Sequence, residues 1–168
     1  MQKRLLYLYL YLPVLALALQ QCAASRKLKY SAQNEETIRV WFEEGWNKHQ
    51  NLALIERCFS PDWTDGNPIR SNQAEGYEGI RQMVGFYEKA FAETHFVLTH
   101  IFADETHAAV RYEVRGRHVS DAFGIPTTGK IFVSSGIVLY EMDKGKIKRS
   151  WQELDLMGII KQLKSTTD

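Results

Sequence analysis

This sequence of 168 residues carries almost no net charge and few of the patterns that mark common functional sites. Its 21 basic and 20 acidic residues give a formal net charge of +1, which provides no electrostatic basis for binding nucleic acid. It contains neither a phosphate-binding glycine-rich loop nor a nucleophile elbow. His95, His100 and His107 lack metal-ligand spacing with any carboxylate pair. We therefore predict no metal site and no cofactor.

Cysteine is also scarce, with two residues in the chain. Cys58 lies in an apolar stretch with helical spacing, where a thiol packs as a small hydrophobic group more readily than it forms a disulfide.

The N-terminus has the pattern of an export signal. Lys3 and Arg4 precede a leucine-rich apolar segment over residues 5–19, and small residues follow it. As a helix this segment would be about 22 Å long, which is short of the roughly 30 Å hydrocarbon layer of a membrane. We predict that residues 1–25 direct export, and that the domain lies outside the cytoplasm in a bacterial periplasm or cell envelope.

Cys22 leaves two kinds of export signal open. A leucine three residues before a cysteine resembles a bacterial lipoprotein signal, in which this cysteine is lipidated and tethers the domain to the membrane. Gln20 and Gln21 depart from the small residues usual at that place. Ordinary cleavage after Ala24 or Ser25 is the alternative. A lipid on Cys22 would be the chain's one membrane contact.

The remainder has the composition of one globular domain, with 45% hydrophobic and 24% charged residues. Residues 26–33 are polar and are predicted to be a linker, followed by a domain over residues 34–165. Apolar residues recur at helical spacing in its first half. The predicted helices cover residues 34–48, 52–59 (with Asn51 as N-cap) and 77–91.

The second half is predicted to be mostly strand. Residues 107–119 alternate cleanly, with Val110, Tyr112 and Val114 on one face and arginines on the other. Similar runs over residues 95–103, 130–142 and 146–155 complete a meander, and a short helix over 156–163 closes the chain. We therefore predict an α+β fold in which a cone-shaped, curved antiparallel sheet wraps around the N-terminal helices and leaves a cavity.

The strongest candidate for chemistry is Asp155, at the end of the last strand. It shares strand parity with Ile147 and Trp151, so the three side chains face the cavity unless a bulge intervenes. A carboxylate beside an indole would have a raised pKa and would be a better base near neutrality. The alternative is that Asp155 caps the closing helix.

Other candidates are a histidine and a set of aromatic side chains. His118 lies on the apolar face of its strand, either as an acid that assists catalysis or as a hydrogen-bonded core residue. A pocket for a flat, apolar or aromatic molecule needs aromatic walls. The residues predicted to line it are Trp46, Trp63, Tyr112, Tyr140, Trp151 and His49, the last of which could instead be a partner of a helix dipole.

Several segments together resemble the SnoaL-like polyketide cyclases (ester cyclases), which have the nuclear-transport-factor-2-like and ketosteroid-isomerase-like fold. The segments occur in the family's order between residues 36 and 163. They are "WNKH" with "IERCFSPDW", "EGYEGIRQMVGFYEKAF", "GRHVSDAFGIPTTGK" and "GIVLYEMDKGKIKRSWQELDLMGIIKQL". The pair G-x-P-x-T-G-K and W-x-x-x-D is the more specific part.

The resemblance implies a cofactor-free enzyme that closes a polyketide ring by intramolecular aldol condensation, with Asp155 at the position of the family's acid/base. Two positions depart from the pattern. Gly66 stands near a place where members often have histidine, and Tyr140 stands near another. A non-catalytic module that binds a small apolar molecule in the cell envelope, or that forms a homodimer through its sheet, is therefore the alternative to an enzyme.

Overall fold

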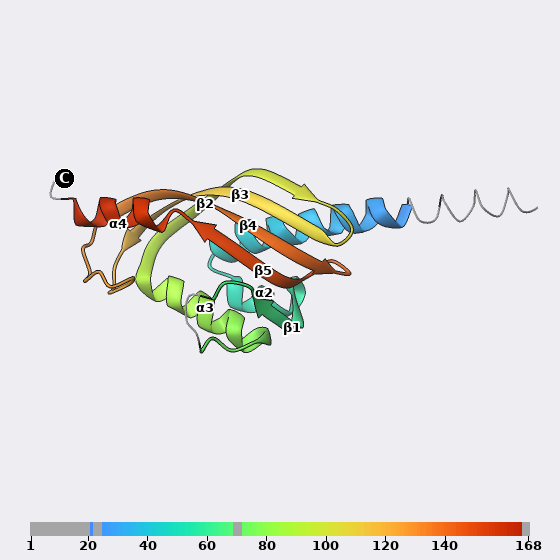
Figure 1. Ribbon diagram of the computed structural model, residues 1–168, viewed down its shortest axis with the longest axis horizontal. Coiled ribbons are helices and arrows are strands. Elements are labelled where there is room, and N and C mark those ends of the chain that lie inside the picture. The colour runs from blue at the N-terminus through green and yellow to red at the C-terminus, as the bar shows by residue number, and fades with distance from the viewer. Residues whose placement is uncertain (1–20, 22–24, 69–71, 166–168) are drawn as a thin grey trace, which may run out of the picture.

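The computed structural model describes residues 21, 25–68 and 72–165. The predicted export signal, with Cys22, falls almost wholly outside these residues and stays a prediction. Within them, the chain forms helices packed against one face of a curved sheet, with the first helix crossing behind the sheet and projecting beyond it (Figure 1). Among the described residues, no helix is both long and apolar enough to cross a membrane.

The first helix begins earlier than the sequence predicts. Residues 25–39 are helical, so the segment 26–33, which we expected to be a linker, is part of this helix. The segment is rich in strong helix formers, and extending an existing helix needs no new nucleus. Ser31 Oγ donates to the Ala103 carbonyl oxygen at 2.8 Å, and Asn34 Nδ2 donates to that of Asp104 at 2.7 Å. These bonds fix the helix to the turn between two strands.

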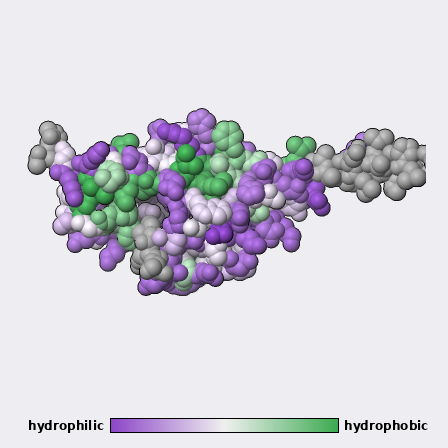
Figure 2. All heavy atoms as spheres, viewed as in Figure 1, coloured by the Kyte–Doolittle hydropathy of each residue, from purple (hydrophilic) through white to green (hydrophobic). Residues whose placement is uncertain are grey.

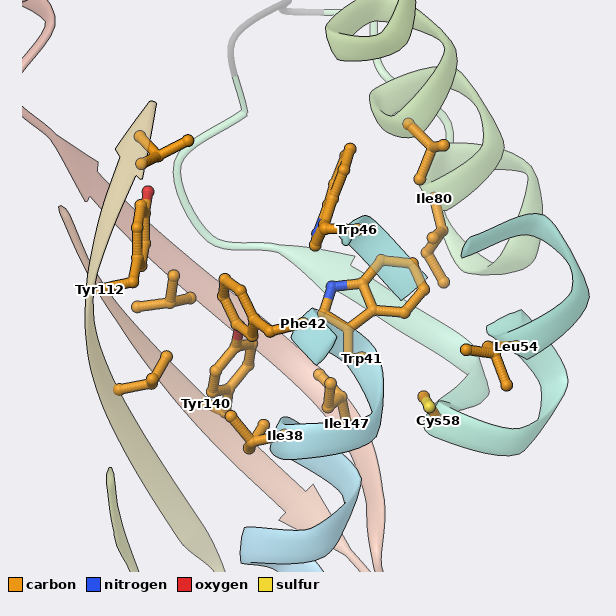
Figure 3. Close-up of a cluster of buried hydrophobic side chains, with 14 of the residues drawn as sticks. Ile38, Trp41, Phe42, Trp46, Leu54, Cys58, Ile80, Tyr112, Tyr140 and Ile147 are labelled. Atoms are coloured by element: carbon orange, nitrogen blue, oxygen red, sulfur yellow. The ribbon is translucent and has the colours of Figure 1, made fainter. Parts of the chain in front are cut away.

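The helix then widens into a π-helix, η1 (Val40–Trp46), whose wider turn is frequent at functional sites. Phe42 projects from η1 toward the inner face of the sheet, where Tyr112 and Tyr140 lie (Figure 3). Trp41 packs against Phe59 and Trp46 against Tyr87. The ring centroids of Phe42 and Tyr112 are 5.4 Å apart. This aromatic contact joins the first helix to the sheet.

Three further helices complete the helical part: α2 (Asn51–Cys58), α3 (Gly76–Ala90) and α4 (Leu156–Lys164). Cys58 is buried and free, and burial raises the pKa of its thiol to about 11. The prediction that it packs as a small hydrophobic group is confirmed. Gln50 rather than Asn51 is the N-cap of α2.

The sheet has five strands in the order β1-β5-β4-β3-β2. Their bounds are β1 (Phe59–Asp65), β2 (Phe91–Ala103), β3 (His107–His118), β4 (Ile131–Asp143) and β5 (Lys146–Leu154). The four strands β2 to β5 form the predicted antiparallel meander. The predicted α+β fold is confirmed, but the sheet is mixed rather than purely antiparallel. β1 runs parallel to β5, and the chain between them forms α3 and the strands β2 to β4.

The outer face of the sheet exposes apolar side chains on β4. Ile131, Val133, Ile137 and Leu139 are all at least 40% exposed, while their neighbours in sequence point inward and are mostly buried. Apolar surface also gathers at the end of the molecule where α4 lies (Figure 2). The core is therefore confined to the inner face, between the sheet and the helices.

Asn47, just after η1, fastens the helix to the free edge of β2. Its side-chain Nδ2 donates to the Phe96 carbonyl oxygen at 2.8 Å, and its Oδ1 accepts from the Phe96 N–H at 2.7 Å. The amide thus pairs with Phe96 as a neighbouring strand would. Since Phe96 also packs against Phe42 and Trp46, this pair of bonds positions β2 against η1.

We expect Asn47→Ala to lower the free energy of unfolding by about 1–3 kcal/mol, because it leaves both polar groups of Phe96 without their partners. Chemical denaturation measures this loss. The matched control is Asn72→Ala at an exposed loop position, for which we expect a change within about 0.5 kcal/mol. Equal stability of the two variants would contradict the role given to Asn47.

Candidate functional site

A cavity of about 560 Å³ lies between η1, α3 and the inner face of the sheet. Ten of its 22 lining residues are Phe, Tyr or Trp. Of the predicted pocket residues, Trp46, Tyr112, Tyr140 and His49 line it. The remaining predicted site residues lie elsewhere: Trp63, Trp151, His118 and Asp155 are not part of the wall.

A β-bulge in β5 explains where Trp151 and Asp155 lie. Ile147 pairs with Met142, whereas Arg149 pairs with the preceding residue, Glu141, so that Lys148 is an extra residue in β5. An extra residue reverses the facing of every later side chain in the strand. Beyond the bulge the side chains that line the cavity are Ser150, Gln152 and Leu154, and Trp151 lies on the opposite face.

Trp151 packs on the outside of the sheet against two neighbours. The Arg149 guanidinium lies 4.8 Å from the centre of its ring. On the other side, a Cβ added at Gly66 would collide with the indole nitrogen. A histidine, which the family often has near this position, cannot replace Gly66 unless Trp151 moves. The sequence departure at Gly66 therefore goes together with the outward placement of Trp151.

Asp155 is exposed and acts as the N-cap of α4. Its Oδ1 accepts from the Gly158 N–H at 2.9 Å, and its own N–H donates to the Ser135 carbonyl oxygen at 3.1 Å. An aspartate oxygen at this position satisfies one of the free N–H groups at the start of a helix. Capping accounts for the position of Asp155, and its carboxylate is not in the cavity wall.

His118 is fully buried at the end of β3. Its Nδ1 lies 3.1 Å from Thr128 Oγ1, and its ring is 5.9 Å from that of Phe91, which lines the cavity. Its Nε2 has no hydrogen-bond partner among the described residues. The predicted inward facing is correct, and the packing is that of a core histidine behind the cavity wall.

The polar groups of the wall were only partly foreseen from the sequence. Gln152 Nε2 donates to the Tyr112 hydroxyl at 2.8 Å, which leaves the phenol proton of Tyr112 free to be donated into the cavity. Trp63 Nε1 donates to Ser150 Oγ at 3.2 Å from behind the wall. Gln152 and Ser150 were not predicted to line the cavity, because counting alternate side chains through Lys148 places both on the outer face of the sheet.

Three tyrosines line the cavity, and burial keeps each one protonated. It raises the pKa of Tyr112 to about 12, although the bond from Gln152 opposes this shift. Burial also raises the pKa of Tyr87 and, well above its ordinary value, that of Tyr140. The hydroxyl of Tyr140 has no protein partner among the described residues. At neutral pH these phenols are therefore hydrogen-bond donors and not bases.

The rim of the cavity carries the ionisable groups, His49, Glu88 and Glu93. Glu93 forms an ion pair with Arg117, with Nε and Oε1 3.0 Å apart, and this arginine holds the pKa of Glu93 below its ordinary value. Within the described part of the chain, no three His, Cys, Asp or Glu side chains gather closely enough to hold a metal ion.

The architecture, a curved sheet closed by helices around an apolar cavity, is shared with solved structures. TsrD from Streptomyces laurentii has 24% identity and a TM-score of 0.67, over 81% of this chain and 96% of its own. A candidate SnoaL-like polyketide cyclase from Jannaschia sp. CCS1 has 19% identity and a TM-score of 0.72, over 82% of this chain and 95% of its own. A SnoaL-like polyketide cyclase from Agrobacterium tumefaciens C58 has 23% identity and a TM-score of 0.61, over 73% of this chain and 91% of its own. At these identities the likeness shows the fold alone.

The family follows from the sequence match. The model of the SnoaL-like polyketide cyclase family matches residues 36–163, which is most of the chain. The protein belongs to this family, and the resemblance inferred from its motifs is confirmed. Membership supports a function of the cyclase or isomerase type. A search of curated proteins found no significant match.

If Asp155 acts only as a helix cap, Asp155→Ala should lower the free energy of unfolding by about 1 kcal/mol, and Asp155→Asn by much less, because asparagine caps nearly as well. Thermal unfolding compares the two variants, and ligand binding in the cavity should be unchanged in both. Loss of activity in Asp155→Asn with unchanged stability would instead support the catalytic interpretation.

The buried phenols should make the fold sensitive to alkali. An unfolded chain releases tyrosine protons at about pH 10, whereas folded Tyr112 holds its proton to about pH 12. The folded state thus binds more protons between these two pH values than the unfolded chain does. The contribution of Tyr112 to the free energy of unfolding is therefore fully present below about pH 10 and is lost as the pH rises through about 12. We expect a late step in the tyrosinate absorbance that coincides with unfolding and is smaller in Tyr112→Phe. A single early step with the fold intact would contradict this.

Proposed function

We propose that this protein binds a flat, largely apolar small molecule that carries a hydrogen-bond acceptor, such as a carbonyl group, within the cavity. The observation that carries the proposal is the pairing of an aromatic wall with free phenol donors. Tyr112 keeps its proton available because its oxygen already accepts from Gln152. Tyr140 has an unpartnered hydroxyl in the same wall.

The size and chemistry of the wall support a neutral ligand. About 560 Å³ is within the range of small-molecule sites. No lysine or arginine occurs among the described residues that line the cavity, so nothing there would neutralise a carboxylate or phosphate. Glu88 at the rim would also repel an anion. Aromatic rings in the wall favour a flat molecule, because they contribute large apolar contact surfaces.

A second function, cyclase or isomerase-type catalysis on the same ligand, is favoured by the membership of the family. Such reactions pass through an enolate, whose oxygen gains negative charge. A protonated Tyr112, held in place by Gln152, would donate to this oxygen and lower the energy of the transition state. Acid–base work by Asp155 would require its carboxylate to leave the cap of α4.

Binding can be tested with Prodan, a neutral naphthyl ketone whose emission shifts to the blue in apolar surroundings and to the red on hydrogen bonding. We expect saturable binding to the wild type. Tyr112→Phe should weaken it roughly five- to tenfold, the effect of one lost hydrogen bond, and should shift the emission of the bound probe to the blue.

Two tryptophan substitutions separate the cavity from the outer surface. Val114→Trp fills the cavity and should abolish Prodan binding, whereas Val133→Trp, on the exposed outer face of β4, should leave it unchanged. Circular dichroism verifies that both variants fold. Equal binding by the two would place the probe outside the cavity and overturn the proposal.

A further inference from the structure

His49 occupies a backbone conformation that glycine would adopt more easily. It follows η1 with a φ of 55°, in the left-handed region. The Gln50 N–H donates to the Gly45 carbonyl oxygen at 2.8 Å, so this turn closes the helix. Helices commonly end on a left-handed residue, usually glycine because it has no Cβ. Histidine is among the residues with a side chain that are found in this region more often than others.

The side chain of His49 lines the mouth of the cavity. It follows Trp46, whose ring packs against Tyr87 and Phe96 in the same wall. Among the described residues, the imidazole takes part in no hydrogen bond or ion pair. Both ring nitrogens are therefore available to a ligand that enters the cavity.

The other ionisable groups of the cavity are less suited to accept a proton. Glu93 is held by Arg117, whose two nitrogens lie 3.0 and 3.3 Å from its carboxylate oxygens. Glu88 is an exposed carboxylate on α3, and carboxylates are weak bases near neutrality. The tyrosines of the wall remain protonated. Asp155 and His118 do not line the cavity.

We propose that His49 is the catalytic base of this cavity, which removes a proton from the carbon next to the carbonyl group of the bound ligand. This inference rests on the proposed function, since it requires a carbonyl compound in the cavity. In the step, the C–H bond breaks, its proton passes to an imidazole nitrogen, and its electron pair forms the enolate. The enolate oxygen accepts from Tyr112, and the carbon can then regain a proton or form a new C–C bond.

The charges around His49 are compatible with this role. Glu88 from α3 lies at the same rim and would stabilise the imidazolium that the step creates. Glu93 from β2 and its partner Arg117 together add no net charge, and Lys48, the preceding residue, opposes the imidazolium. Tyr87 from α3 adds no charge.

The test follows exchange of the α-protons of β-tetralone, a flat neutral ketone, for deuterium in D₂O by NMR. We expect the wild type to accelerate exchange over buffer, and His49→Gly and His49→Gln to lower this acceleration by about 100-fold, the usual contribution of a general base. His49→Gly should have an unchanged or higher melting temperature, because glycine suits the left-handed conformation. His95→Gln, on the exposed outer face of β2, is the matched control and should exchange at the wild-type rate.

Displacement of Prodan by β-tetralone is measured on the same samples. In one outcome the ketone binds, but the wild type exchanges its α-protons no faster than buffer does, or the His49 variants exchange them as fast as the wild type. His49 is then not the base, and the proposed binding function stands. If the wild type binds neither Prodan nor the ketone, the proposed function fails and this inference with it.

Discussion

One extra residue in β5 determines which side chains of the last strand meet the cavity. The bulge at Lys148 reverses the facing of the strand between Ile147 and Arg149. Gln152 consequently points inward and reaches the Tyr112 hydroxyl. Without the bulge, Trp151 would take its place in the wall. The side chains that β5 adds to the wall, Ser150 and Gln152 rather than an indole, depend on this single irregularity.

The wall opposite the sheet depends on η1. A π-helix has a wider turn than an α-helix, and here it carries Trp41, Phe42 and Trp46 to the cavity. Its end is fixed by Asn47 and by the left-handed turn at His49. This side of the cavity is thus built from a short stretch of chain whose geometry departs from the regular α-helix.

Much of the fold could be predicted from the sequence, because apolar periodicity is strong in the three helices and in β3 and β4. Tyr112 and Tyr140, two of the residues predicted to line a pocket, are in the wall of the cavity. Lys148 could not be recognised as a bulge, since one added residue leaves no mark on a strand whose residues after Ile147 are mostly polar. The error passed to Trp151 and Asp155, whose parity was counted from Ile147. The parallel pairing of β1 also escaped prediction, because it joins segments far apart in sequence.

The two bonds between Asn47 and Phe96 have a consequence for the behaviour of the protein in solution. β2 is an edge strand of the sheet, and edge strands expose unpaired N–H and C=O groups on which other chains can add. The amide of Asn47 occupies both groups of Phe96 from within the same molecule. Intermolecular strand addition, the first step toward aggregation, is therefore blocked at the point where β2 passes the mouth of the cavity.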